Sequence, residues 1–196
     1  MLYSSAVYPS KDATLEQAQQ YKLQRICEQV ELQQGDTVIE IGTGWGAFAI
    51  YAATHYDCHV TTTTISDEQH DYVANKIKEL GLENKITLLK QDYRLLTGKY
   101  DKLVSIEMIE AVGHEYLPSF FTQCGQLLKD DGAMLIQAIT ISDQRYQHYL
   151  KNSDFIQQYI FPGGCLPSLN EMSEQIKNHT DMNIHTVNDI GVHYAR

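Results

Sequence analysis

Short apolar runs alternate with amphipathic stretches along most of this chain. Runs rich in Val, Ile, Leu and Thr are typical of buried strands, and segments with apolar residues at helical spacing separate them. The predicted strands are Thr37–Ile41, His59–Thr64, Ile86–Lys90, Lys102–Ile106 and Ala133–Ala138. The predicted helices are Thr14–Val30, Ala47–Tyr56, Asp67–Leu80 and Leu117–Leu128. This alternation predicts an α/β fold: a Rossmann-like, mainly parallel, doubly wound sheet with helices on both faces.

Local polar patterns mark several element boundaries. The first helix begins at a predicted capping box, in which Thr14 and Gln17 bond each other's backbone N–H groups. The turn Lys129–Gly132 introduces the fifth strand, and Met182–Val187 is predicted to form a sixth. Since a sheet of this type usually ends in an antiparallel hairpin, a chain that stops soon after this strand is expected to be a fragment.

We expect one globular domain, residues 1–196, because the length and the 43% hydrophobic content suffice for a single core. Residues 1–35 are expected to form a covering segment and a helix, and residues 36–141 the Rossmann-like core. Residues 142–168 are an aromatic insertion, and residues 169–196 are expected to supply a helix and the start of C-terminal strands.

The aromatic insertion allows two interpretations. Its rings are Tyr146, Tyr149, Phe155, Tyr159 and Phe161, followed by a Pro162-Gly163-Gly164 turn. They either line a pocket for an apolar substrate or only pack the insertion onto the domain. The sequence leaves both interpretations open.

Charge and cysteine content exclude several classes of partner. The net charge is -10, with 15 basic residues scattered against 25 acidic ones, which argues against nucleic acid and against strong docking on an anionic membrane. Four cysteines lie far apart without CxxC spacing, and no apolar leader or membrane-spanning run is present, so a reduced, cytoplasmic protein with free thiols is expected. The histidines and cysteines show no metal-ligand spacing, so no metal is predicted.

A glycine-rich turn follows the first predicted strand. Gly42, Gly44 and Gly46 let the backbone turn sharply and approach a ligand closely, and the next helix offers unpaired N–H groups at its start. Glu40 is expected to place a fixed negative charge beside this turn. These features predict a nucleoside-bearing cofactor, although a strand-to-helix turn that binds nothing has the same form.

Two cofactor classes fit the spacing of this turn. Gly42, Gly44 and Ala47 also satisfy the dinucleotide pattern, which requires an acid at the end of the next strand for the ribose hydroxyls. That strand, His59–Thr64, contains no acid. S-adenosylmethionine, which carries a sulfonium and an amino group, is therefore favoured over NAD beside Glu40.

Ligands of such sheets bind at the carboxyl ends of the strands. Glu107 and Glu110 follow the fourth strand beside an otherwise apolar segment, which favours a functional role over that of two solvated acids. Gln69 lies three residues after Ser66, so the pair also satisfies a capping box. A helix start alone therefore suffices to explain both of these residues.

Several segments together resemble the cyclopropane-fatty-acyl-phospholipid synthase family, which includes the mycolic acid cyclopropane synthases. The segments are Tyr3–Tyr8, Leu15–Gln19, Glu40–Gly46, Thr64–Gln69, Gln91–Arg94, Glu107–Gly113 and Tyr159–Ser168. The resemblance implies a class I methyltransferase that moves the methyl group of S-adenosylmethionine to the double bond of an unsaturated phospholipid acyl chain. A cyclopropane ring then forms through a carbocation, and in this family a bound bicarbonate is thought to take the proton. A phospholipid substrate also implies transient contact with the inner face of the membrane.

The resemblance also implies roles for individual residues. Residues near the cofactor are Tyr3 and Ser4 at its methionine part, Gly42, Gly44 and Gly46 around it, Thr64 and Gln69 at the ribose, and Gln91 and Asp92 at the adenine. Glu110 matches the glutamate that holds bicarbonate, and Ile106 and Ile139 match positions that line the same pocket.

Two departures concern the bicarbonate. Ser5 stands where many family members have Cys, and Gln137 stands where they have His. Both side chains still donate hydrogen bonds, but neither titrates near neutral pH. A family tyrosine near the bicarbonate is expected to lie in a C-terminal region that this chain lacks.

Two alternatives to ring formation stay open. In the first alternative, the chain is a related methyltransferase whose acceptor is either an amine or an acyl chain that is methylated without ring closure. The other alternative is a cofactor-binding fragment without catalysis. The sequence does not indicate an oligomeric state.

Overall fold

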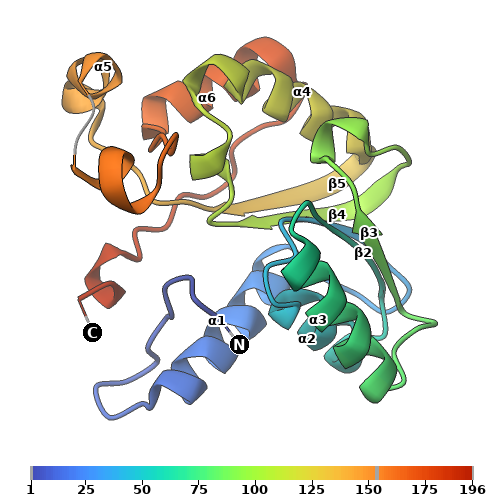
Figure 1. Cartoon of the computed structure of the whole chain (residues 1–196). Helices are drawn as coiled ribbons and strands as arrows, with labels where there is room; N and C mark the ends of the chain where they lie inside the picture. Colours follow the sequence, from blue (N-terminus) through green and yellow to red (C-terminus); the bar gives the residue numbers. More distant parts are fainter. Residues whose placement is uncertain (1, 153–154, 196) are drawn as a thin grey trace.

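The computed structural model describes residues 2–152 and 155–195; Met1, Ser153, Asp154 and Arg196, which belong to the predicted terminal parts and aromatic insertion, lie outside the described residues. Five parallel strands form one sheet in the order β3-β2-β1-β4-β5 (Figure 1). The strands are β1 (Thr37–Ile41), β2 (His59–Thr64), β3 (Ile86–Lys90), β4 (Tyr100–Ile106) and β5 (Leu128–Gln137). Because the strand order reverses at β1 and β4, the carboxyl ends of these two strands are where such a sheet binds its ligand.

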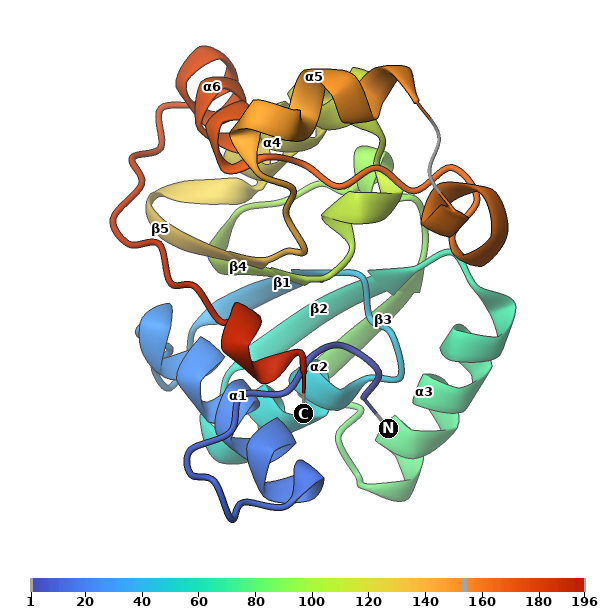
Figure 2. The same cartoon turned by 90° about the vertical axis from the view of Figure 1, so that its left-hand side faces the viewer.

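Helices cover both faces of the sheet, as Figures 1 and 2 show. Helices α1 (Leu15–Gln29), α2 (Ala47–His55) and α3 (Asp67–Glu79) lie on one side, and α4 (Leu117–Leu127), α5 (Asp143–Lys151) and α6 (Leu169–His179) lie on the other. The connections contain the short helices η1 (Tyr93–Leu95), η2 (Ile109–Ala111), η3 (His114–Tyr116), η4 (Ile156–Ile160) and η5 (Gly191–His193). The predicted fold class is therefore confirmed.

The sheet is buried on both faces, as parallel sheets require. Val38 and Val60 pack under the first helix layer, whereas Ile39 and Leu103 pack with Phe120 of α4 on the other side. The predicted capping box of α1 is confirmed, since Gln17 N donates to Thr14 Oγ1 at 3.2 Å and Thr14 N donates to Gln17 Oε1 at 2.9 Å. The two core layers fix the strand ends that carry the candidate site.

Two predictions about strands are wrong. Strand β5 begins at Leu128, so the predicted turn 129–132 lies inside it; there the pairing slips, because Tyr100 pairs with Leu128 but Lys102 pairs with Ala133. Residues 182–187 form no strand. Met182 packs on the core while Ile184 and Val187 are exposed, so this segment does not bury an alternating face.

The two ends of the described chain meet at the carboxyl edge of the sheet, as Figure 2 shows. Tyr8 N donates to His193 Nδ1 at 3.2 Å, and the two rings stack with centroids 6.3 Å apart. Residues from both ends can therefore reach the segments that follow β1, β4 and β5.

Candidate functional site

The glycine turn after β1 has the left-handed backbone that its composition predicts. Gly42, Gly44 and Gly46 have φ angles of 99°, 51° and 80°. A Cβ on Gly42 would lie 3.0 Å from Met108 Cγ, and a Cβ on Gly44 would lie 3.6 Å from the ring of Tyr3. The turn is therefore close to both the N-terminal segment and the loop after β4, and glycine is required for this approach.

A cavity of about 40 Å³ lies between this turn and the N-terminal segment. Its lining includes Tyr3, Ser4, Glu40, Gly42, Gly44 and Ile106, which are six of the predicted site residues. Gly46 is absent from this lining and instead occupies the N-cap position of α2. The structure thus brings the predicted methionine-side residues together around one space.

Glu40 is buried beneath the turn, with 2% of its surface exposed. Thr62 Oγ1 donates to Glu40 Oε2 at 2.6 Å and lies 2.6 Å from Thr43 Oγ1. Burial raises the pKa of Glu40 to about 8, against the smaller opposing effect of the Thr62 hydrogen bond. Burial therefore disfavours the fixed negative charge that was expected from the sequence.

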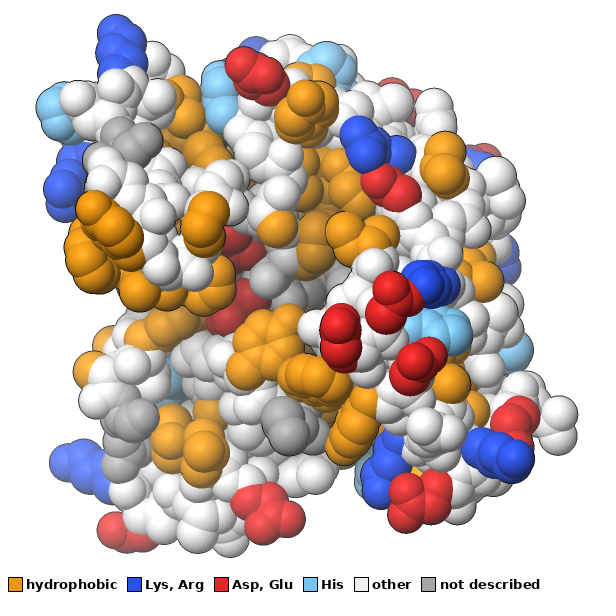
Figure 3. Space-filling view, viewed as in Figure 1, with side chains coloured by type: hydrophobic (Ala, Val, Ile, Leu, Met, Phe, Trp, Pro, Cys, Tyr) orange, Lys and Arg blue, Asp and Glu red, His pale blue; other side chains and the backbone are white. Residues whose placement is uncertain are grey.

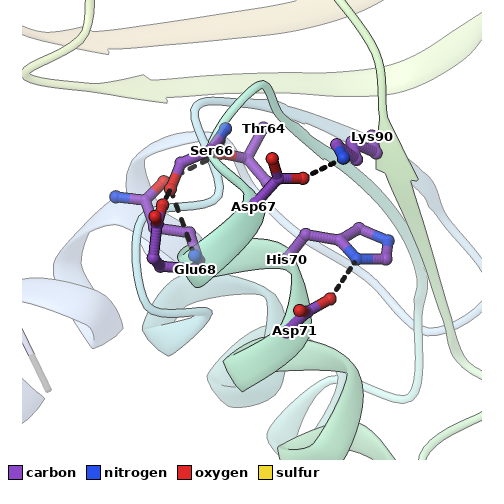
Figure 4. Close-up of polar contacts among 8 residues, drawn as sticks. Thr64, Ser66, Asp67, Glu68, His70, Asp71 and Lys90 are labelled. Atoms are coloured by element: carbon purple, nitrogen blue, oxygen red, sulfur yellow. Dashed lines mark hydrogen bonds and ion pairs between the residues drawn. The ribbon is translucent and has the colours of Figure 1, made fainter.

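Thr64 lies at the end of β2, near the start of α3 (Figure 4), and its side chain bonds to that of Gln69. Thr64 Oγ1 donates to Gln69 Oε1 at 2.8 Å, and Ser66 Oγ accepts from Gln69 N at 3.2 Å. Ser66 therefore caps α3, but the reciprocal half of the capping box is missing because the Gln69 side chain turns to Thr64. This departure leaves the Gln69 side chain at the ligand end of β2, where the ribose contact was predicted.

Gln91 and Asp92 lie in the turn after β3. Gln91 Nε2 donates to Leu95 O at 2.7 Å, and the Asp92 carboxylate caps η1 through Arg94 N at 2.9 Å. Hydrogen bonds from Arg94 lower the pKa of Asp92, against a small opposing effect of burial. Both side chains thus shape the loop where the adenine contact was predicted.

Glu110 lies in η2 with one carboxylate oxygen left unbonded. Its Oε1 accepts from Ile139 N at 2.5 Å. Its Oε2 is buried and has no hydrogen-bond partner among the described residues. Burial raises the pKa of Glu110, and the nearby charge of Glu107 raises it further. An unpartnered buried carboxylate oxygen requires an explanation, and a ligand is one.

Glu107, immediately after β4, collects donors from three separate segments. Its Oε1 accepts from Ser5 N at 3.1 Å, from Gln137 Nε2 at 2.9 Å and from the Tyr194 hydroxyl group. Tyr194 was not among the predicted site residues. Ser5 takes part through its backbone, because its hydroxyl group donates to Ala6 O at 3.3 Å.

Sequence reasoning also missed Lys22, which is only 1% exposed. Its Nζ donates to Ser4 Oγ at 2.6 Å. Burial lowers the pKa of Lys22 to about 8, although the charge of Glu107 opposes this shift. A signal was present in the sequence, because Lys22 lies between Ala18 and Ile26 on the buried stripe of α1.

The aromatic insertion divides into a packed part and an exposed part. Tyr146 and Tyr149 of α5 are buried, whereas Phe155, Tyr159 and Phe161 around η4 are exposed. Figure 3 shows apolar side chains gathered over η4 at the rim of a hollow in which acidic side chains lie recessed. The packing interpretation therefore holds for Tyr146 and Tyr149, whereas the pocket interpretation stays a prediction for the exposed rings.

A second cavity, of about 320 Å³, adjoins this insertion. It lies between η3, α5 and the Gly163–Cys165 segment, with Leu150 and Gln157 in its wall. Cys165 N donates to Glu110 O at 2.7 Å, so one wall of this cavity is hydrogen-bonded to the backbone of Glu110. His114 lines the same cavity, and its Nδ1 lies 2.9 Å from the Tyr146 hydroxyl oxygen.

Residues 2–152 and 155–195 contain neither a helix that could span a membrane nor a cluster of metal ligands. None of the helices in these ranges is both long and apolar enough to cross a bilayer. The same residues contain no group of three or more His, Cys, Asp and Glu side chains that could hold a metal ion. The four cysteines are free thiols.

Two known proteins are similar to this chain at the same level of sequence identity. The chain is 38% identical to tuberculostearic acid methyltransferase UfaA1 of Mycobacterium tuberculosis over 91% of its length and 42% of that protein. It is also 38% identical to cyclopropane-fatty-acyl-phospholipid synthase of Escherichia coli K12, over 91% of its length and 44% of that protein. The chain thus spans less than half the length of these two relatives.

Solved structures agree with this relationship. Mycolic acid cyclopropane synthase CmaA1, in a complex with SAH and CTAB, superimposes with a TM-score of 0.90 at 30% identity, covering 99% of this chain and 71% of that one. The family profile described as mycolic acid cyclopropane synthetase matches residues 1–196. This chain, with its Rossmann-like methyltransferase fold, therefore belongs to the mycolic acid cyclopropane synthetase family.

Proposed function

We propose that this chain is the core of an S-adenosylmethionine-dependent methyltransferase that methylates the double bond of an unsaturated phospholipid acyl chain. The observation that carries the proposal is the position of the glycine-turn cavity beside the Glu107–Glu110 segment, joined to it through Gly42 and Met108. S-adenosylmethionine would supply an electrophilic methyl group from its sulfonium. The cofactor and carbon-acceptor chemistry also agrees with the names of the two relatives that are 38% identical.

The cofactor would be held along the carboxyl ends of β1, β2 and β3. Tyr3 and Ser4 would contact its methionine part, while Thr64 with Gln69 and the Gln91–Asp92 turn would contact its nucleoside. The cavity of about 40 Å³ is far smaller than the ~300 Å³ or more that is usual for ligand sites. Tyr3 is 69% exposed, so an outward shift of the N-terminal segment is the simplest way to admit the ligand.

The acceptor would approach from the side of η4. A carbon–carbon double bond is a weak nucleophile, so the protein must position it, exclude water and stabilise the positive charge that methylation creates. The unpartnered Oε2 of Glu110 is suited to the last task because its negative charge is buried, where electrostatic interactions are strong. The apolar rings around η4 and the adjoining cavity of about 320 Å³ are suited to an acyl chain.

Two products are consistent with this site. Ring closure gives a cyclopropane, as the name of the Escherichia coli relative states for that protein. Methylation without ring closure is the second candidate, favoured by the equal identity to a relative named as a tuberculostearic acid methyltransferase. An amine acceptor fits less well, since the exposed wall at η4 is apolar.

The test uses the full-length protein that contains this chain. It is incubated with S-adenosylmethionine labelled in the methyl group and with vesicles of unsaturated phospholipid, with saturated phospholipid as the matched control. Label is expected only in the unsaturated lipid, and proton NMR of the released fatty acid separates a cyclopropane from a branched chain. Equal labelling of the two lipids, or labelling of neither, would contradict the proposal.

A further inference from the structure

One carboxylate oxygen in this site is bonded as a bound anion would be. Glu107 Oε1 accepts from a backbone N–H of the N-terminal segment, a side-chain amide at the end of β5 and a hydroxyl group near the C-terminus. The donors Ser5 and Tyr194 are far apart in sequence and meet at this atom. Donors that converge from separate segments on one point are typical of a site for negative charge.

The residues present do not fit a bicarbonate. Ser5 and Gln137, which were expected to bind it, donate to Glu107. Ile139 N, which lies on the same edge, donates to Glu110 at 2.5 Å. A bicarbonate would have to displace a carboxylate that is covalently part of the chain, and its charge would then lie near two other negative charges. The anion position is thus already filled.

The backbone at Glu107 is a second, independent observation. Its φ of 48° lies in the left-handed region, which strains a residue with a Cβ but not a glycine. Glu107 N also donates to Gln137 O at 2.8 Å, which holds the strained residue in place. Strain of this kind persists where the surrounding structure requires a particular side chain, and here that side chain is a carboxylate.

We propose that Glu107 replaces bicarbonate in this protein and is itself the proton acceptor of the reaction, an inference that rests on the proposed methylation of a double bond. Methylation leaves a carbocation, which must lose a proton. A C–H bond of the added methyl group breaks, and its electron pair forms the carbon–carbon bond that closes the ring. The proton passes to the Glu107 carboxylate, which becomes a neutral carboxylic acid and later releases the proton to water. If the carbocation instead loses a proton to give an alkene, the electron pair of the broken C–H bond forms the double bond, and Glu107 accepts the proton in the same way.

The test compares wild type, Glu107→Gly and Glu107→Gln in the full-length protein, in buffer freed of bicarbonate and after bicarbonate is restored. Wild-type turnover is expected to be the same in both buffers. Glu107→Gly removes the carboxylate and relieves the backbone strain, so it is expected to fold, to lose about 100-fold in turnover without bicarbonate and to recover when bicarbonate is added. Glu107→Gln fills the same space without a base, so bicarbonate is not expected to restore it.

A melting experiment separates failure of this inference from failure of the proposed function. Bicarbonate is expected to raise the melting temperature of Glu107→Gly and to leave wild type unchanged, whatever the acceptor of the methyl group is. The inference is overturned if wild-type turnover needs bicarbonate, or if Glu107→Gly keeps full turnover without it. It is equally overturned if bicarbonate neither stabilises nor reactivates that variant. If wild type labels no lipid, the proposed function fails and the melting result alone decides whether Glu107 fills the anion position.

Discussion

The carboxyl edge of the sheet has two halves that are built in different ways. The cofactor half is built mainly from the turns that directly follow β1, β2 and β3, such as the one that joins Thr64 to Gln69, with the N-terminal segment as its outer wall. The reaction half, after β4 and β5, depends on residues from both ends of the chain that converge on Glu107. Local turns can be recognised in a sequence, whereas a site made by distant segments exists only once the chain is folded. The halves touch where Gly42 meets Met108.

The largest expected effect lies in the reaction half. Glu110→Gln is expected to lower turnover by about 100-fold to 1,000-fold, because it removes a buried negative charge beside the developing positive charge. Cofactor affinity, measured by calorimetric titration, is expected to stay unchanged. Glu83→Gln, at an exposed position outside both cavities, is the control. An equal loss of affinity and turnover in Glu110→Gln would remove the distinction between the halves.

The next effect lies in the cofactor half. Gly44→Ala places a Cβ near Tyr3 in the cavity and strains a φ of 51°, so cofactor affinity is expected to fall about tenfold or more. Gly35→Ala has comparable backbone strain, with a φ of 85°, but open space around it. Calorimetric titration should show that Gly35→Ala retains cofactor affinity. Urea unfolding should show that the same variant is less stable than wild type. Wild-type affinity in Gly44→Ala would show that the ligand binds elsewhere.

Glu40, in the cofactor half, is expected to make the stability of the protein depend on pH. Since its folded-state pKa of about 8 lies above the ordinary value of 4.5, the unfolded chain loses this proton first as the pH rises. The free energy of unfolding is therefore expected to fall between pH 4.5 and pH 8, by on the order of a few kcal/mol. Urea unfolding at pH 5 and pH 8 should show a smaller fall in Glu40→Gln than in wild type. Glu83→Gln, at an exposed position, should show the same fall as wild type. If Glu40→Gln also shows the wild-type fall, Glu40 is not the group responsible for the pH dependence.

The smallest expected effect concerns the C-terminal contribution to the reaction half. Tyr194→Phe removes one donor to Glu107 at a partly exposed position, where water can replace the hydroxyl group. Turnover in the lipid assay is expected to fall about tenfold or less, with cofactor affinity retained. Tyr100→Phe, which removes a hydroxyl hydrogen bond at the opposite end of β4, is the control. No change in Tyr194→Phe would mean that the C-terminal segment is not part of the site.

The sequence predicted the first three strands to the residue, because they are runs of apolar and β-branched residues with clear turn residues on either side. It failed at β5, which has one neighbouring strand, and in the segment beyond it, although β3 at the opposite edge was predicted correctly. The turn predicted at residues 129–132 lies within β5, and the apolar residues of 182–187 do not share a buried face. Tertiary packing overrides local preference at such positions.

The candidate site divides in the same way. The glycine turn and Glu110 were found because each lies in a short recognisable segment. The raised pKa of Glu40, the burial of Lys22 and the convergence of Ser5 and Tyr194 on Glu107 were not predicted. Each depends on which distant residues pack nearby, and no spacing along the chain encodes that.

The separation of the two halves is tested most directly by a double-mutant cycle of Gly44→Ala and Glu110→Gln in the full-length protein, measured as kcat/KM for the cofactor with unsaturated phospholipid. If one half binds the cofactor and the other carries out the chemistry, the two losses are expected to add to within about 0.5 kcal/mol. A coupling energy well above that value would show that the turn and the carboxylate act as a single unit, which contradicts the division of the site proposed for this protein.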